Sequence, residues 1–399
     1  MDISDKFTKH YFWIVASLFL LIALAMGLAF ILPAREDVHD FVTLYAADFA
    51  ILHHVPLYNT PAIISLMIDK LSLRPDFTVF PYPYPPWFAL STFFLAFLPP
   101  QKAANVWMFI NIALLFTSAF LLTTKWKPIA RILAITAALV FIPSIGLIVV
   151  GQYSALVLLG ATLFLYAAQR EDAPLTALGL LLMTFKPHLG LFLLPVSFFW
   201  LVFQKTPFAR RAIWMTLAGG LLLAVLGFLA DAAWPITYVR SLMAYTTIPG
   251  VANRDLSASF SALLVKMLLG YGSAFWATCL SVVLIAIMLV LFWRFKIFAQ
   301  LEMLVAGCIL LTLLGDPYMF NYDYVLILLP LALLVRHAKS IVSRFIVGVA
   351  YFVPWLSLVL ERNANILYAV SAIFLFIILI RQSQNLGKTG KLANQPPPA

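Results

Sequence analysis

Charged residues are scarce in this chain, and their scarcity excludes a water-soluble globular protein. Only 11% of the 399 residues are Asp, Glu, Lys or Arg, whereas 63% are hydrophobic. A soluble domain cannot hide so much apolar surface in one core, so much of that surface must face lipid. Runs such as 212–230 and 275–292 are long enough, or nearly so, to cross a hydrocarbon layer about 30 Å thick. The composition therefore predicts a polytopic helical membrane protein.

Several features that would indicate other classes of protein are missing. The two cysteines, Cys279 and Cys308, lie in apolar runs and give no basis for a disulfide framework. No histidine has a metal-ligand spacing such as His-Glu-x-x-His, and we expect neither a metal nor another cofactor. No internal repeat of the kind found in many transporters is evident. The net charge is +10, but the basic residues fall in short clusters between apolar runs, which does not indicate nucleic acid.

The basic clusters orient the chain, because Lys and Arg favour cytoplasmic loops. With the N-terminus inside, twelve crossings place 17 of the 26 basic residues but only 5 of the 16 acidic residues on the cytoplasmic side. Both termini are then cytoplasmic. The acidic, loop-rich face of the protein lies on the extracytoplasmic side of the plasma (inner) membrane. The predicted spans are 11–32, 104–123, 131–150, 154–168, 174–186, 188–203, 212–230, 274–293, 300–315, 324–335, 343–360 and 364–380.

We expect a single integral-membrane domain over residues 1–381, followed by a polar, disordered cytoplasmic tail over 382–399. The first apolar run follows Lys6 and Lys9 and could be mistaken for a signal peptide. It is about 20 residues long, which exceeds the apolar part of a typical cleavable signal. We therefore expect an uncleaved anchor.

Two long outer segments, 33–103 and 231–273, contrast with the short connections on the inside. The first contains an amphipathic stretch, 61–73, that could lie in the membrane interface. It also contains an apolar stretch, 87–98, that is too short to span comfortably. We expect interfacial helices in this loop, with 87–98 re-entrant or lying on the outer surface.

Two kinds of charged residue on the outer face could carry chemistry. A carboxylate at the lipid boundary, such as Asp40, can act as a general base toward a hydroxyl, and Asp48 is the reserve because it lies eight residues on, about two helical turns. Lys186 interrupts a strongly apolar hairpin, a costly placement that usually marks a partner such as a phosphate. The alternatives are that the acids belong to a solvated loop and that the lysine reaches the lipid headgroups.

A series of short motifs lies within roughly residues 10–335, and its members are Asp40-Phe-Val-Thr-Leu-Tyr45, Pro56-Leu-Tyr58, Tyr84-Pro85-Pro86, Gly151-Gln152, Lys186-Pro187, Asn253 and the Asp-Pro and Tyr-rich turn at 316–323. In this order the motifs resemble those of family 87 glycosyltransferases. Two departures are Asn253-Arg254-Asp255, where the family often has Asn-Gln-Ser, and Asp323-Tyr324, where it has a His-Tyr pair. These departures leave the donor sugar and the acceptor open.

The resemblance implies a GT-C fold and inverting transfer of a sugar, commonly mannose, from a polyprenyl phosphate donor in cell-envelope glycolipid synthesis. It implies a lipid or glycan acceptor. The apolar composition implies contact with membrane lipids, and the scattered basic clusters imply no nucleic-acid partner. The acid after the first span, here Asp40, is the family's proposed base. We hypothesise that Lys186 and Arg254 contact the donor phosphate. The residues that we expect to bind substrate are Tyr45, Tyr58, Tyr84, Trp87, Gln152, His188, Asn253 and Asp323.

A different class remains open, namely a transporter or lipid flippase without covalent chemistry. A transporter should place ionisable residues near the middle of the bilayer, whereas nearly all the acids here fall at span ends on one side. A membrane scaffold is a third possibility, but it leaves Lys186 and the acidic outer loop unexplained. The asymmetry therefore favours an interfacial enzyme.

Overall fold

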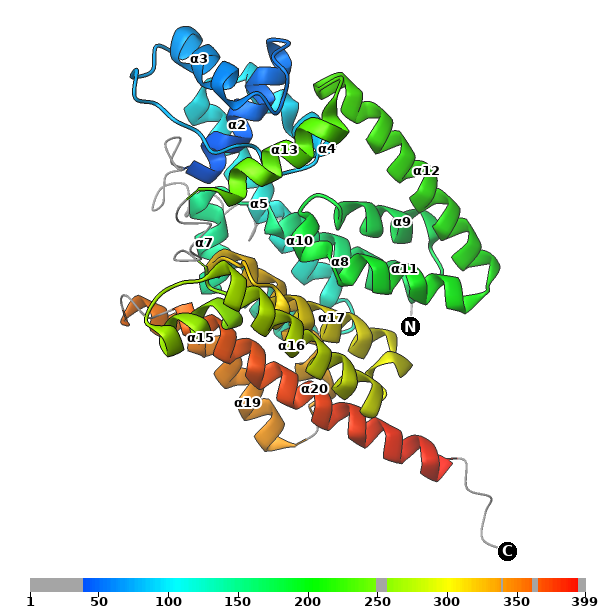
Figure 1. Ribbon diagram of the computed structural model, residues 1–399. Coiled ribbons are helices and arrows are strands. Elements are labelled where there is room, and N and C mark those ends of the chain that lie inside the picture. The colour runs from blue at the N-terminus through cyan, green and yellow to red at the C-terminus, as the bar shows by residue number, and fades with distance from the viewer. Residues whose placement is uncertain (1–38, 249–256, 339, 361–364, 394–399) are drawn as a thin grey trace, which may run out of the picture.

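The computed structural model describes residues 39–248, 257–338, 340–360 and 365–393, and every regular element within them is helical (Figure 1). The predicted all-helical class is therefore confirmed. The first predicted span, 11–32, lies outside the described residues.

Proline and glycine set many of the helix limits. The helices α5 (Pro100–Leu122), α6 (Pro128–Val140) and α12 (Pro207–Ala230) each begin with a proline. At that position the missing N–H of proline costs no helical hydrogen bond. The helix α7 (Ile142–Val150) ends at Gly151, whose φ of 74° lies in the left-handed region that glycine adopts most easily.

The predicted count of twelve crossings is not confirmed. Within the described residues, six helical segments are long and apolar enough to span a membrane, or seven if α6 and α7, which meet at an angle of 51°, form one bent span. The six are α5, α12, α16 (Ala274–Arg294), α20 (Asn365–Ala393), the pair α10 (Pro187–Gly190) and α11 (Leu193–Gln204), and α19 (Ile341–Phe352) with η4 (Val353–Leu358).

Four of the predicted spans fold as shorter helices of 10 to 15 residues, whereas a perpendicular crossing needs about 20. Burial explains the difference, because a short helix in the protein core is as apolar as one in lipid. Every residue of α17 from Met303 to Gly315 is buried, for example. The four are α8 (Ser154–Ala168), α9 (Ala173–Leu182), α17 (Leu301–Gly315) and α18 (Leu328–His337).

The centre of the bundle is built on α8 and α17, and the peripheral helices expose apolar side chains that lipid can cover. Leu229 of α12 is 74% exposed, and Trp293 of α16 is 76% exposed. The helix α9 crosses α8 closely, because a Cβ atom at Gly160 would lie only 2.7 Å from the carbonyl oxygen of Gly179.

The first long outer segment and the start of the second, 231–248, pack together into one lobe, drawn at the top of Figure 1. The helix α15 (Phe260–Leu269), also in the second segment, packs against α16 in the lower part of the molecule. The Ser241 hydroxyl donates to the carbonyl of Tyr82 at 2.8 Å, and the rings of Tyr58 and Tyr238 lie 5.6 Å apart. The stretch 87–98 forms part of this lobe, and its position relative to the membrane surface stays a prediction. The elements of the lobe are α2 (His39–Leu52), α3 (Thr60–Leu71), α4 (Pro86–Thr92), η1 (Phe93–Phe97) and α13 (Trp234–Thr246).

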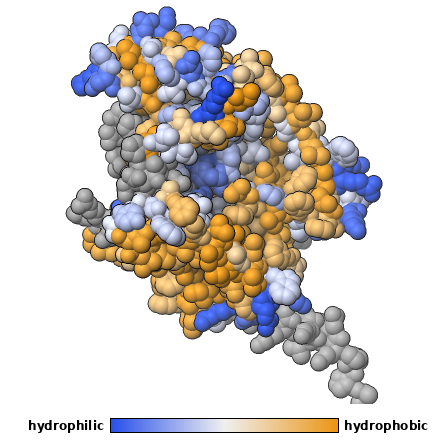
Figure 2. Space-filling model, viewed as in Figure 1, coloured by the Kyte–Doolittle hydropathy of each residue, from blue (hydrophilic) through white to orange (hydrophobic). Residues whose placement is uncertain are grey.

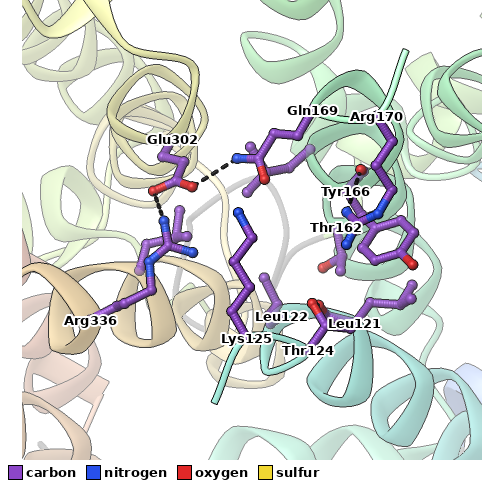
Figure 3. Close-up of a pocket in the computed structure, with 12 residues that line it drawn as sticks. Leu121, Leu122, Thr124, Lys125, Thr162, Tyr166, Gln169, Arg170, Glu302 and Arg336 are labelled. Carbon is purple, nitrogen blue, oxygen red and sulfur yellow. Dashed lines mark hydrogen bonds and ion pairs between the residues drawn. The ribbon is translucent and has the colours of Figure 1, made fainter. Parts of the chain in front are cut away.

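An ion-pair cluster lies at the C-terminal end of α8 (Figure 3). Glu302, in the first turn of α17, accepts hydrogen bonds from Arg336 and, at 2.7 Å, from Gln169. His337 lies 2.7 Å from the same carboxylate. Because α8 has 15 residues, the cluster is about 22 Å along the helix from Ser154.

Candidate active site

Lys186 is buried beside the start of α8, with only 1% of its surface exposed. Its Nζ donates to Oδ1 of Asp323 at 2.6 Å, to Oγ of Ser154 at 2.9 Å and to Oε1 of Gln152 at 3.0 Å. An ammonium group has three hydrogens to donate, and all three are used here. The predicted contact between Lys186 and a donor phosphate would therefore require the release of one of these partners.

Asp323 is fully buried in the short 3₁₀ helix before α18 and binds several donors at once. Its Oδ1 also accepts from the Ser154 hydroxyl at 2.5 Å, and its Oδ2 accepts from the backbone N–H of Phe320 at 3.1 Å. Nε2 of His188 lies 3.9 Å from Oδ2. Burial alone would raise the pKa of Asp323, but Lys186 and then His188 lower it well below its ordinary value. The carboxylate is therefore ionised.

Tyrosine rings surround this pair. Nζ of Lys186 lies 4.9 Å from the ring centroid of Tyr322 and 5.5 Å from that of Tyr153, within the range of a cation–π contact. The ring of Tyr84 packs edge-on against Tyr153 at 4.4 Å. Residues from widely separated parts of the chain thus meet at one place. The predicted residues that the structure brings together are Tyr84, Gln152, Lys186, His188 and Asp323.

Asp40 approaches this cluster from the first turn of α2, where it is half-buried. Burial raises the pKa of Tyr322, and the charges of Asp40 and Asp323 raise it further. The pKa of Tyr84 is also raised, first by burial, and both carboxylates contribute. Because the two carboxylates act on the same two rings, Asp40 lies within electrostatic range of the Lys186–Asp323 pair. Figure 2 shows hydrophilic surface inside a hollow between the outer lobe and the helices below it.

Gly151 allows the first turn of α2 to rest against the end of α7. A Cβ atom at Gly151 would lie 2.8 Å from the Cβ of Phe41, the residue after Asp40. The carbonyl of Gly151 accepts a hydrogen bond from the indole of Trp107 at 2.7 Å. The Gly151-Gln152 motif thus positions α2 through Gly151 and binds Lys186 through Gln152.

The family model of glycosyltransferase family 87 matches residues 82–317, which is more than half of the chain. The chain belongs to glycosyltransferase family 87. No curated protein and no solved structure matches the chain. Together with the apolar helices, the match makes this protein a membrane glycosyltransferase, which sets aside the transporter and scaffold alternatives.

The match is shorter than the resemblance over roughly residues 10–335 that the motifs indicated. It includes Tyr84, Gln152 and Lys186, whereas Asp40 and Asp323 lie outside it. The family match therefore does not support a role for either acid, and the support for both comes from the geometry of the site.

Three other predicted residues support the outer lobe with their polar atoms. Of the three, Tyr58 has the most direct link to the site, because its hydroxyl donates a hydrogen bond to the backbone carbonyl of Tyr84. The ring of Tyr45 also lines a cavity of about 790 Å³ between α2, α3 and the loop after α3. The hydroxyl of Tyr45 donates to the carbonyl of Leu98 at 2.8 Å, that of Tyr58 to the carbonyl of Tyr84 at 2.8 Å, and the indole of Trp87 to the hydroxyl of Thr184 at 3.1 Å.

The geometry argues against Asp48 as a reserve base. Its side chain has no exposed surface, and Oδ1 accepts from the hydroxyl of Thr92 at 3.0 Å. Burial raises the pKa of Asp48 well above its ordinary value, which disfavours the ionised form that a general base needs. Asn253 and Arg254 lie outside the described residues.

Sequence reasoning missed Ser154 and Tyr322, which both contact Lys186. Ser154 is the first residue of α8, and a serine at a helix start usually has only a capping role. Nothing in the sequence relates it to Asp323, which is 169 positions away. In the part of the chain that the structure describes, no group of three or more His, Cys, Asp or Glu could hold a metal ion.

Substitution of Gly151 by alanine should reduce both stability and transfer, whereas Gly270→Ala should reduce stability alone. Both glycines have a positive φ, so an alanine should introduce backbone strain of about 1 kcal/mol at either position. Only Gly151 adds a clash, because nothing lies within 4 Å of a Cβ atom at Gly270. Melting temperature and transfer rate of the purified variants measure the difference. Equal losses in the two variants would show that contact with Phe41 is unimportant.

Proposed function

We propose that this family 87 glycosyltransferase takes a sugar, with mannose as the first candidate, from a polyprenyl phosphate donor. The acceptor is a lipid-linked or glycan hydroxyl on the outer face of the plasma membrane, and the transfer inverts the anomeric carbon. The observation that carries the proposal is the convergence of Asp40 with the Lys186–Asp323 pair around Tyr84 and Tyr322. An inverting transfer needs one general base and stabilisation of the leaving phosphate, and this cluster offers groups for both tasks.

Asp40 is the proposed base. A half-buried carboxylate beside buried tyrosines can remain ionised while it is partly shielded from water, which suits it to accept the proton of an acceptor hydroxyl.

The donor phosphate requires cationic or hydrogen-bonding groups that the protein has not already used. Lys186 donates its three hydrogens to Asp323, Ser154 and Gln152, so we assign it a positioning role. His188 is better placed, because about a third of its side chain is exposed while Nε2 faces the Asp323 carboxylate. We propose that His188, together with Arg254, meets the phosphate.

The test of the donor class uses full-length protein in lipid vesicles, a membrane lipid extract as the source of acceptors, and two sets of radiolabelled donors. One set carries sugars on polyprenyl phosphate, and the other carries the same sugars on nucleotides. We expect label to enter the extract from polyprenyl-linked sugars alone, with mannose giving the fastest transfer.

Heat-inactivated protein controls for label that moves without catalysis. Transfer from nucleotide sugars but not from polyprenyl-linked sugars would refute the donor class and leave the family assignment intact. Faster transfer of another sugar would refute only the choice of mannose.

A further inference from the structure

A groove lies on the apolar side of the bundle, between α5, α6, α18 and α19, and has a volume of about 500 Å³. Its walls are mainly alanine and leucine, and they include Ala134 and Leu133 of α6 and Leu331 of α18. No Asp or Glu is among the residues that line it. The groove lies toward the C-terminal end of α5, and Ser154, Lys186 and Asp323 of the candidate active site are not among the residues that line it.

One face of α19 forms a wall of this groove. The lining residues Arg344, Val347, Gly348, Tyr351 and Phe352 follow a spacing of three and four, which places them on one side of the helix. Gly348 leaves a hollow in this face, because nothing lies within 4 Å of the position where its Cβ atom would be. Glycine is unfavourable inside a helix, so Gly348 lowers the helix stability of α19 relative to an alanine at the same position.

The two ends of the groove differ in chemistry. At one end the hydroxyl of Tyr351 donates to the carbonyl of Ala137 at 2.9 Å, and this bond ties α19 to α6. At the other end lies the exposed guanidinium of Arg344, whose Nε donates to the carbonyl of Ala338 at 3.0 Å. Trp126 lines the same end and is flanked in sequence by two exposed lysines, Lys125 and Lys127. The groove therefore has an apolar body and a positively charged mouth.

The length of the groove matches one leaflet of a bilayer. The eight helical steps from Arg344 to Phe352 rise about 12 Å along the helix axis, and half of a hydrocarbon core is about 15 Å. Arginine, lysine and tryptophan are the residues that favour the level of the lipid headgroups. An acyl chain lying in the groove would place its phosphate beside Arg344.

We propose that this groove binds one acyl chain of an anionic phospholipid, whose phosphate pairs with Arg344. The apolar walls accommodate the chain, and the open space over Gly348 allows it to pack against the backbone of α19. The charged mouth selects an anionic headgroup over a zwitterionic one. The site does not depend on the identity of the sugar donor.

The experiment is native mass spectrometry of the full-length protein in detergent, titrated separately with phosphatidylglycerol and with phosphatidylcholine of the same acyl chains. We expect the parent protein to retain phosphatidylglycerol more strongly. Arg344→Gln should weaken that retention by about fivefold, because one cation near an anionic lipid surface contributes about that factor. Gly348→Leu should fill the groove and remove retention of both lipids. Val342→Leu, at an exposed position of α19 outside the groove, is the matched control.

Two outcomes would overturn the proposal. Equal retention of the two lipids by the parent protein would show that the site does not select an anionic headgroup. Undiminished retention by Gly348→Leu would show that the lipid does not bind in the groove. If Gly348→Leu does not fold, Ala134→Leu fills the same space from the wall on α6. Sugar transfer by each variant, which we expect to be unchanged, reports that the variant is folded.

Discussion

Asp40→Asn should lower the rate of sugar transfer by about 10²- to 10⁴-fold, the usual contribution of a general base. An amide has nearly the same shape as the carboxylate but cannot accept the proton of the acceptor hydroxyl. Because Asp40 is only half-buried, we expect the melting temperature to change little. Rates are measured at saturating donor, so that the loss falls on the chemical step. Asp40→Ala is the second variant, because an asparagine can hydrolyse slowly back to aspartate whereas an alanine cannot.

The matched control for this prediction is Asp48→Asn, on the same helix eight residues away. The two acids differ in burial, and Asp48 is fully buried and bound to the hydroxyl of Thr92. Because the Asp48 side chain has no exposed surface that a substrate could reach, transfer by Asp48→Asn should continue near the parent rate. If Asp48→Asn lost activity while Asp40→Asn kept it, the assignment of the base would be reversed.

The sequence could predict an all-helical membrane protein but not the number of crossings. Hydropathy measures only whether a residue avoids water, and it does not distinguish a helix that faces lipid from one that faces other helices. The helix α17 is apolar because it is buried on every side, and α12 is apolar because its exposed side chains can face lipid. Length separates them better, since α17 has 15 residues and α12 has 24.

The site could be predicted in part, because charged and polar residues stand out in apolar surroundings. Lys186 stands out in the sequence on that ground alone. Its neighbours in the structure, Gln152 and Asp323, are polar residues that the sequence also predicts to belong to the site. Their pairing could not be predicted, because it depends on how α8, α10 and the late 3₁₀ helix pack. The sequence therefore favoured a phosphate as the partner of Lys186, whereas the structure provides a carboxylate within the same chain.

Breaking the Lys186–Asp323 pair should be the most destabilising change that the site allows. Removal of one partner leaves the other charge buried without compensation, which typically costs about 3–5 kcal/mol. We therefore expect Lys186→Met and Asp323→Asn each to lower the melting temperature strongly and to abolish transfer. The double variant should be more stable than the sum of the single losses predicts, because neither charge is then left alone.

The double-mutant cycle separates a positioning role for Lys186 from direct binding of the donor. If Lys186 positions Asp323 and His188, stability and activity should fall together in both single variants, and the double variant should regain stability without activity. If Lys186 also binds the donor phosphate, Lys186→Met should raise KM for the donor more than Asp323→Asn does, at a similar loss of melting temperature. Thermal denaturation and donor-dependent rates on the same preparations therefore distinguish the two roles. The three hydrogen bonds from the Lys186 ammonium to the protein favour positioning.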